Sequence, residues 1–195
     1  MIRLLKNRYA LATVITTLII LVVAVLLAGV VCYFAINVVS TRVQQESLKV
    51  SNVHAWVDGA GTAEAALMIT NIGGRDVVVS QIQVRGQSSA FSTGGNVYYA
   101  VKGTGDTIPS TLSPIAFTTP ANIVGAIPFP APSTTALALS GVDLVLSSGG
   151  TMIVYITSPD SVTINDVGLT IGLTVFSAQA MYYQETNIQA TTVTL

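Results

Sequence analysis

The stretch YALATVITTLIILVVAVLLAGVVCYFAINVVST, residues 9–41, decides the fold of the N-terminal part of this chain because it contains no charged side chain. About 30 residues would form a helix of roughly 45 Å, whereas the hydrocarbon core of a bilayer needs only about 20 residues. Arg3, Lys6 and Arg8 precede the stretch. The sequence therefore predicts a membrane helix with several turns to spare. The positive-inside rule places its N-terminus in the cytoplasm and residue 45 onward outside.

The rest of the chain is sparsely charged. Charged residues make up 9% of the 195 residues, against about 25% in typical proteins. From Ser51 onward there are three cations, Arg75, Arg85 and Lys102, and eight acids. A nucleic-acid-binding surface needs clustered Lys and Arg, so no nucleic-acid partner is expected. The single cysteine, Cys32, excludes an internal disulfide and a CxxC motif.

After the helix, which is expected to end near Ser47, the pattern becomes that of β-strands. Apolar residues alternate with polar ones from Leu48 to Val57, with one slip near Val53. Six of the seven prolines lie between Pro109 and Pro132, which predicts long exposed loops there. Further strands are expected at 63–70, 77–84, 96–101, 114–117, 123–127, 135–146, 152–157, 167–176 and 179–194. The predicted fold is α+β: a long N-terminal hydrophobic α-helix followed by an antiparallel, Ig-like β-sandwich.

The residues that catalysis needs are scarce. His54 is the only histidine and no nucleophile accompanies it, so it is expected to be structural or interfacial. Asp160 and Asp166 flank turns, where Asp ordinarily bonds to its own backbone. The acids after the helix are scattered, whereas a metal ion needs clustered oxygen ligands. We therefore predict no enzyme activity, no catalytic residues, no metal and no cofactor.

Residues 8–19, RYALATVITTLI, resemble the N-terminus of archaeal type IV pilins and archaellins, which carry a class III signal peptide. Val14-Ile15, Thr17 and Leu18 match the family pattern in register with Ala10, although Ala12-Thr13 replaces the usual Ser-Pro. The resemblance implies that a prepilin-type peptidase cuts between Ala10 and Leu11. It implies a basic leader peptide at 1–10, an assembly helix at 11–47 and an extracellular domain at 48–195.

A second patch, Thr70-Asn71-Ile72-Gly73-Gly74, resembles the Thr-Asn-x-Gly-Gly turn of many archaeal pilin-like proteins. Together the two patches imply a structural subunit of a surface filament that serves adhesion or motility, and the second patch favours a pilus over an archaellum. Such subunits assemble into a homopolymer in which their helices form a central bundle. The implied partners are the prepilin peptidase, the pilus assembly machinery and, before assembly, the cytoplasmic membrane.

Small residues along the apolar stretch are the candidates for contacts between helices. Ala24 and Ala28 form a small-xxx-small pair, which lets two backbones approach closely, and Gly29 and Ala35 are also small. The alternative is a monomeric, membrane-anchored envelope protein whose sandwich binds a ligand or another envelope component. An anchored hydrolase is the least favoured class.

Overall fold

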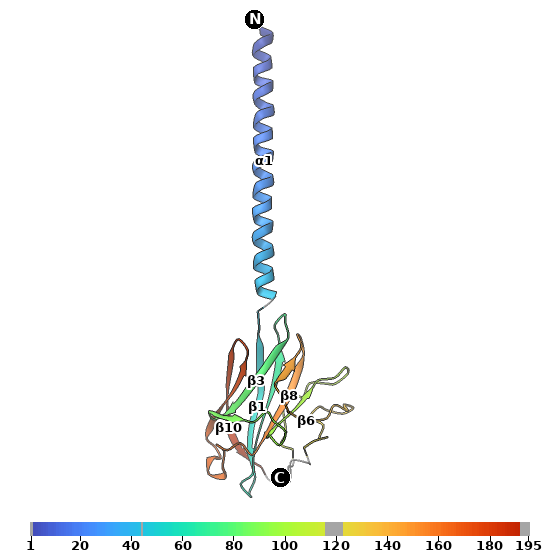
Figure 1. Ribbon diagram of the computed structural model, residues 1–195, viewed down its shortest axis with the longest axis vertical. Coiled ribbons are helices and arrows are strands. Elements are labelled where there is room, and N and C mark those ends of the chain that lie inside the picture. The colour runs from blue at the N-terminus through green and yellow to red at the C-terminus, as the bar shows by residue number, and fades with distance from the viewer. Residues whose placement is uncertain (1, 44, 116–122, 192–195) are drawn as a thin grey trace. The chain divides into compact units, whose positions relative to one another are not determined.

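The computed structural model describes residues 2–43, 45–115 and 123–191, and the chain forms two compact units, Met1–Gln44 and Gln45–Leu195. The first unit is one helix, α1, Ile2–Val43 (Figure 1). It ends before Ser47, where the sequence predicted its end. The backbone carbonyl of Ser47 instead accepts hydrogen bonds from the N–H groups of Ile72 and Gly73, so that residue belongs to the second unit.

The second unit is a mixed β-sheet. Its strands in the described part of the chain are β1 Leu48–Val57, β2 Ala63–Asn71, β3 Val77–Val84, β4 Gln87–Ser89, β5 Val97–Val101, β6 Ala138–Leu139, β7 Leu144–Leu146, β8 Thr151–Thr157, β9 Thr170–Ser177 and β10 Met181–Ala190. A short 3-10 helix, Ile164–Asp166, precedes β9. The strand order is β4-β3-β9-β10-β1-β2-β8-β5-β6, and β7 pairs with β3.

The prediction of a purely antiparallel sheet is wrong at one pairing. β1 and β10 run parallel, with Ala55 opposite Ile188 and Val57 opposite Ala190. A parallel pair needs a long crossover connection, and here almost the whole second unit lies between the two strands. Alternation within either strand does not reveal its partner's direction, so the sequence could not show this. The topology is one curled, mixed sheet, and it does not establish the predicted Ig-like sandwich.

The first hydrophobic core joins the two halves of the sheet. Buried residues from β1, β2 and β8 belong to the same cluster as residues from β3, β7 and β9. Leu67 of β2 and Leu173 of β9 are fully buried members of this cluster. Strands that lie far apart in the strand order therefore share one core, which requires the sheet to curl. The predicted slip in β1 is a β-bulge, because the register with β2 shifts between Ser51 and His54.

A second hydrophobic core covers the opposite face of β1, β2, β8 and β5. Successive side chains of a strand point to opposite faces, so β2 sends Leu67 to the first core and Ala66 and Met68 to the second. The long connection between β5 and β6 covers this face with Leu112 and Phe129, among others. Both faces of β2 are therefore buried, which explains why nearly the whole strand is inaccessible.

Asn71 organises the turn that follows β2. Its side-chain Nδ2 donates to the carbonyl oxygens of Arg75 at 2.7 Å and Leu146 at 3.0 Å, and its Oδ1 accepts from Gly73 N at 3.0 Å. A Cβ at Gly73 would lie 2.8 Å from the carbonyl oxygen of Gln45 and from Ser47 N. The Asn-x-Gly pattern thus has a structural reason: the Asn holds three backbone groups, and the Gly allows the close approach.

The connection between β5 and β6 is where the predicted strands differ most from those observed. Residues 123–125 form a turn, and residues 114 and 115 are outside any strand, while 116 and 117 lie outside the described residues. The predicted strand at 135–146 is two short ones, β6 and β7, and β4 was not predicted. Pro114 disfavours a strand that begins there, because Pro lacks the N–H that a ladder needs, and the turn at 123–125 contains Gly125 with a φ of 98°.

Candidate functional site

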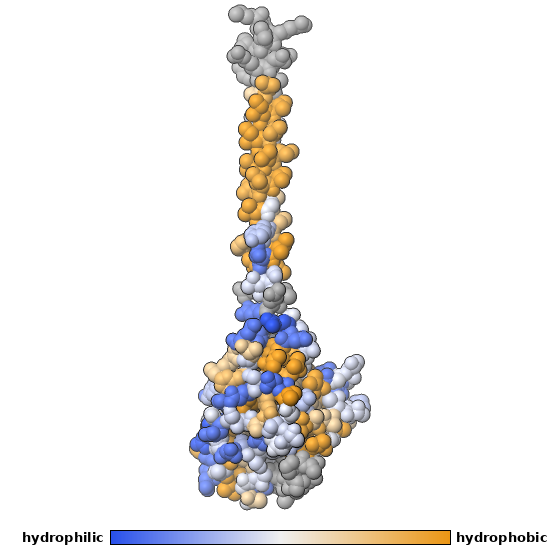
Figure 2. All heavy atoms as spheres, viewed as in Figure 1, coloured by the Kyte–Doolittle hydropathy of each residue, from blue (hydrophilic) through white to orange (hydrophobic). Residues whose placement is uncertain are grey.

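The first candidate site is the surface of α1. Residues 11–41 are exposed throughout, and the large apolar side chains among them are 42% to 73% exposed. Figure 2 shows apolar side chains over most of the visible face of the described helix, with polar ones near its lower end. This 31-residue stretch is long and apolar enough to cross a membrane, and a signal sequence would pass the same test. A helix that is apolar all round needs lipid or other helices around it.

Four polar side chains of this stretch donate hydrogen bonds to the helix itself. Thr16 Oγ1 donates to Ala12 O and Thr17 Oγ1 to Val14 O, each at 2.9 Å. Asn37 Nδ2 donates to Tyr33 O, and Thr41 Oγ1 to Asn37 O, again at 2.9 Å. Such bonds lower the cost of placing these groups away from water.

Three of the four predicted assembly residues lie on one side of α1. At 100° per residue, Ala24, Ala28 and Ala35 fall within about 40° of one another, whereas Gly29 points about 100° away from Ala28. All four are exposed, and a Cβ at Gly29 would meet nothing within 4 Å. The fold of the single chain therefore gives no reason for a glycine there. Ala10 and Leu11, the predicted cleavage residues, lie inside the continuous helix, and their cleavage stays a prediction.

The second candidate site is a polar row on the face that carries the second core. Segment 109–115, called the strap from here on, lies against this face without regular secondary structure. Side chains of β1, β2 and β8 hold it at every second residue. Asn52 Nδ2 donates to Pro109 O at 3.1 Å, His54 Nε2 lies 3.2 Å from Thr111 Oγ1, Tyr155 Oη donates to Ser113 O at 2.9 Å, and Ile115 N donates to both carboxyl oxygens of Glu64 at 3.2 and 3.3 Å.

Of this row, sequence reasoning singled out His54 alone and missed Asn52, Tyr155 and the acid Glu64. The Glu64 side chain is 0% exposed, and burial raises the pKa of the carboxyl to about 9, although the Ile115 N–H opposes the shift. The carboxyl is therefore neutral at pH 7. A signal was available, because Glu64 occupies the same alternating positions as the apolar Ala66 and Met68. A lone acid in a strand with two buried faces has to be buried as well.

His54 has the structural role that the sequence predicted. Its ring stacks on Trp56 with the centroids 5.3 Å apart and the planes 10° from parallel. Burial lowers the pKa of the imidazole, so it is neutral at pH 7. Near the row, a hollow of about 270 Å³ is lined by strap residues, by Pro128 to Pro130 and by Tyr155. No cluster of three or more His, Cys, Asp or Glu occurs among the residues that the structure describes.

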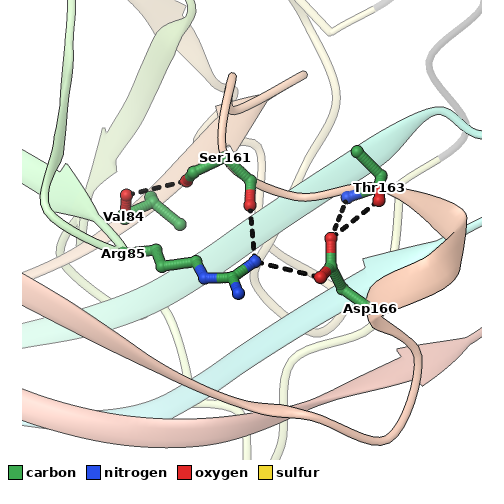
Figure 3. A network of polar contacts seen from close by, with 5 residues as sticks. All are labelled: Val84, Arg85, Ser161, Thr163 and Asp166. Carbon is green, nitrogen blue, oxygen red and sulfur yellow. Dashed lines mark hydrogen bonds and ion pairs between the residues drawn. The ribbon is translucent and has the colours of Figure 1, made fainter.

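The third candidate is Asp160 with Asp166, the two acids that flank turns. In the structure only Asp166 makes a network of polar contacts, and this network holds its turn in place. Asp166 Oδ2 accepts from Thr163 N at 2.9 Å and Thr163 Oγ1 at 2.7 Å, and its Oδ1 pairs with Arg85 at 3.0 Å (Figure 3). Arg85 also donates to Ser161 O. Arg85 and Gly86 both have positive φ, 50° and 81°, as the tight hairpin between β3 and β4 requires. Asp160 has no part in this network.

We expect Asp166→Asn to remove a small acid-side dependence of stability on pH. The Thr163 hydroxyl, the Thr163 N–H and the Arg85 guanidinium lower the pKa of Asp166 below 3.8. A lowered pKa contributes stability that is present above pH 3.8 and is lost as the pH falls through the folded-state value. Thermal unfolding of wild type and variant between pH 2 and 6 measures this (roughly the range of carboxyl titration). If the stabilities of wild type and variant changed in parallel with pH, the lowered pKa of Asp166 would be contradicted.

Comparisons with known proteins do not identify the chain. No protein-family model matches the sequence, and no curated protein sequence is similar to it. Among solved structures, β-glucosidase from Listeria innocua has TM-scores of 0.27 in its complex with glucose and 0.25 in its complex with isofagomine, at 11% and 12% identity over 76% of this chain. The chain covers 16% of that enzyme. A structural similarity this low does not indicate the function of the chain.

Proposed function

We propose that this chain is a structural subunit of an archaeal type IV pilus-like surface filament that polymerises through α1. The observation that carries the proposal is the fully exposed, uncharged helix surface from Leu11 to Thr41. Its 31 residues are about 46 Å long, against the roughly 30 Å of a bilayer core. A helix that leaves lipid for a bundle of identical helices benefits from the additional turns, and a plain anchor does not.

Two further observations support the same proposal. Four polar side chains near the ends of the apolar stretch, those of Thr16, Thr17, Asn37 and Thr41, already donate to their own helix, which lowers the cost of removing them from water. Ala24, Ala28 and Ala35 form a face on which another backbone can approach closely. The resemblance at residues 8–19 and 70–74 adds the expected leader peptide, its peptidase and the assembly machinery. The second unit would lie at the cell surface, on the outside of the filament.

The direct test is to shear intact cells, pellet the released material and sequence the N-terminus of the recovered chain. A sheared filament whose subunit begins at Leu11 supports both processing and polymerisation. A chain that stays in the membrane fraction and begins at Met1 contradicts both. A filament whose subunit keeps residues 1–10 would retain polymerisation and remove the cleavage assignment.

Replacing Ala10 with Phe is expected to prevent removal of the leader peptide, because the resemblance places a small residue beside the cut. The precursor should then accumulate in the membrane with its full mass, and surface filaments should be lost. Mass spectrometry of the membrane fraction measures this. Leu4→Phe, a bulky change inside the leader and away from the cut, serves as the control. An unchanged mature mass in Ala10→Phe would overturn the assignment of the cut.

The alternative, a monomeric anchored envelope protein, is favoured by one observation. The hollow of about 270 Å³ beside the strap combines Phe129 and Tyr155 with proline rings, which suits a small ligand with an apolar face. This function needs α1 only as an anchor. It therefore predicts that α1 can be exchanged for an unrelated membrane helix without loss of activity, whereas the filament proposal predicts that the exchange abolishes assembly.

A further inference from the structure

The strap is attached to the sheet by polar side chains at a regular spacing. Residues 109, 111, 113 and 115 each meet one side chain of the underlying face: Asn52, His54, Tyr155 and Glu64 in that order. These holders come from β1, β2 and β8. A regular ladder of backbone hydrogen bonds would attach a segment as well, but it would not respond to pH. Here three of the four holders are titratable: His54, Tyr155 and Glu64.

The strap closes the second core. Leu112 of the strap is 5% exposed and belongs to the same cluster as Trp56, 4% exposed, and Met68, 8% exposed. Ser110, Thr111 and Ser113 of the strap are exposed, so it has solvent on its outer side. Lifting it would break the four polar attachments and uncover one side of the second core. The first core lies on the other face of the sheet and would keep its contacts.

All three titratable holders are neutral while the strap is closed. Around Glu64, β1 contributes Trp56, β8 contributes Tyr155 and the strap contributes the Ile115 N–H. Of these groups only Tyr155 is titratable, and its own burial, followed by the Glu64 carboxyl, raises its pKa. His54 faces Trp56 and Thr111. The ion pair found in the described part of the chain, Arg85–Asp166, involves none of these holders, so no cation in that part of the chain is paired with an ionised Glu64.

We propose that the strap is a pH-controlled cover of the second core, closed while Glu64 and His54 are neutral and released when Glu64 ionises. Ionised Glu64 would be a buried charge with one hydrogen-bond donor among the described residues, the Ile115 N–H, and release of the strap gives it water without unfolding the first core. His54 adds a weaker release on the acid side, because it is half-buried and its protonated form is also disfavoured. The proposal is independent of the filament.

The direction on the alkaline side follows from the raised pKa of Glu64. The closed form keeps its proton up to about pH 9, whereas a solvated Glu64 loses it near pH 4.5. Between these two pH values the protein with the strap closed therefore binds more protons than the protein with the strap open. Closure is favoured most at the acid end of this pH range. The ratio of open to closed strap rises by up to about tenfold for each pH unit across it.

The single tryptophan makes the test specific, because Trp56 lies under the strap. Its emission and its quenching by acrylamide would be followed from pH 5 to pH 10 on the full-length chain in detergent (about the range set by the Glu64 values). Far-UV circular dichroism would be recorded in parallel. We expect a red shift and stronger quenching as the pH rises, with the β signal unchanged. Glu64→Gln, which keeps an acceptor for Ile115 N, should remove the transition.

Glu185→Gln is the matched control, because Glu185 is an exposed carboxyl on β10, and it should leave the transition in place. An unchanged Trp56 signal up to pH 10, the wild-type transition in Glu64→Gln, or loss of the β signal together with the Trp56 change would each overturn the proposal. If Glu64→Gln does not fold, Tyr155→Phe removes the attachment at Ser113 O while keeping the ring. The midpoint of the Trp56 transition should then move to lower pH. An unchanged midpoint would contradict the proposal that the strap is released in this transition.

Discussion

Replacing Asn71 with Asp is expected to lower the free energy of unfolding of the second unit by about 3 to 5 kcal/mol. Asn71 is 1% exposed, and its Nδ2 donates to two carbonyl oxygens, those of Arg75 and Leu146. Aspartate has the same shape but no donor, so both carbonyls would lose their partner and face a carboxylate instead. Denaturant unfolding of the full-length chain in detergent, followed by circular dichroism, measures the change.

The matched control is Asn187→Asp. Asn187 is exposed, and its Oδ1 accepts from Thr170 Oγ1 at 2.7 Å, a role that a carboxylate fills equally well. We expect its stability to stay within about 0.5 kcal/mol of wild type, as for most surface changes. Equal stabilities for the two variants would show that the three bonds of Asn71 do not hold the turn between β2 and β3 together.

Replacing Ala28 with Phe is expected to abolish surface filaments while leaving the chain in the membrane. The bulky ring would stand on the face shared by Ala24, Ala28 and Ala35 and prevent another helix backbone from approaching. Phe is apolar, so it does not oppose membrane insertion. The measurement is the amount of sheared filament per cell, counted by electron microscopy, beside the amount of chain in the membrane fraction.

Leu26→Phe serves as the control for Ala28→Phe. Leu26 lies about 160° around α1 from Ala28 and is 64% exposed, and the substitution changes its volume little. Filaments should form in this variant. Loss of filaments in both variants would mean that the small face has no special part in assembly. Normal filaments in Ala28→Phe would contradict a close approach at Ala28.

The parts of the fold that depend on local sequence could be predicted. The uncharged stretch predicted α1, alternation predicted β1, β2 and β3 close to their observed bounds, and the slip in β1 predicted its bulge. Pairing could not be predicted, because the parallel contact of β1 with β10 depends on residues far apart along the chain. The end of α1 was placed too late because Ser47 is held by backbone bonds to Ile72 and Gly73, which alternation does not report.

The candidate sites divide in the same way. The face of Ala24, Ala28 and Ala35 follows from the period of an α-helix, which also separates Gly29 from it. The strap could not be predicted, because Asn52, His54, Glu64 and Tyr155 are scattered in sequence and meet residues 109–115 only in the folded sheet. Glu64 alone carried a readable signal, as an acid between apolar neighbours on alternating positions of β2.

The place of β10 has a consequence for the order of events during biosynthesis. This strand is the last of the described chain, yet it lies in the middle of the sheet, between β9 and β1. β1 pairs with β10 through Ala55 and Ile188. If α1 enters the membrane first, this pairing cannot form until the whole segment between the two strands has crossed the membrane. Contacts so distant along the chain form slowly. Export machinery would therefore handle a tethered chain with an incomplete sheet until its C-terminal strand arrives, and a shortened chain would lack the strand that joins β9 to β1.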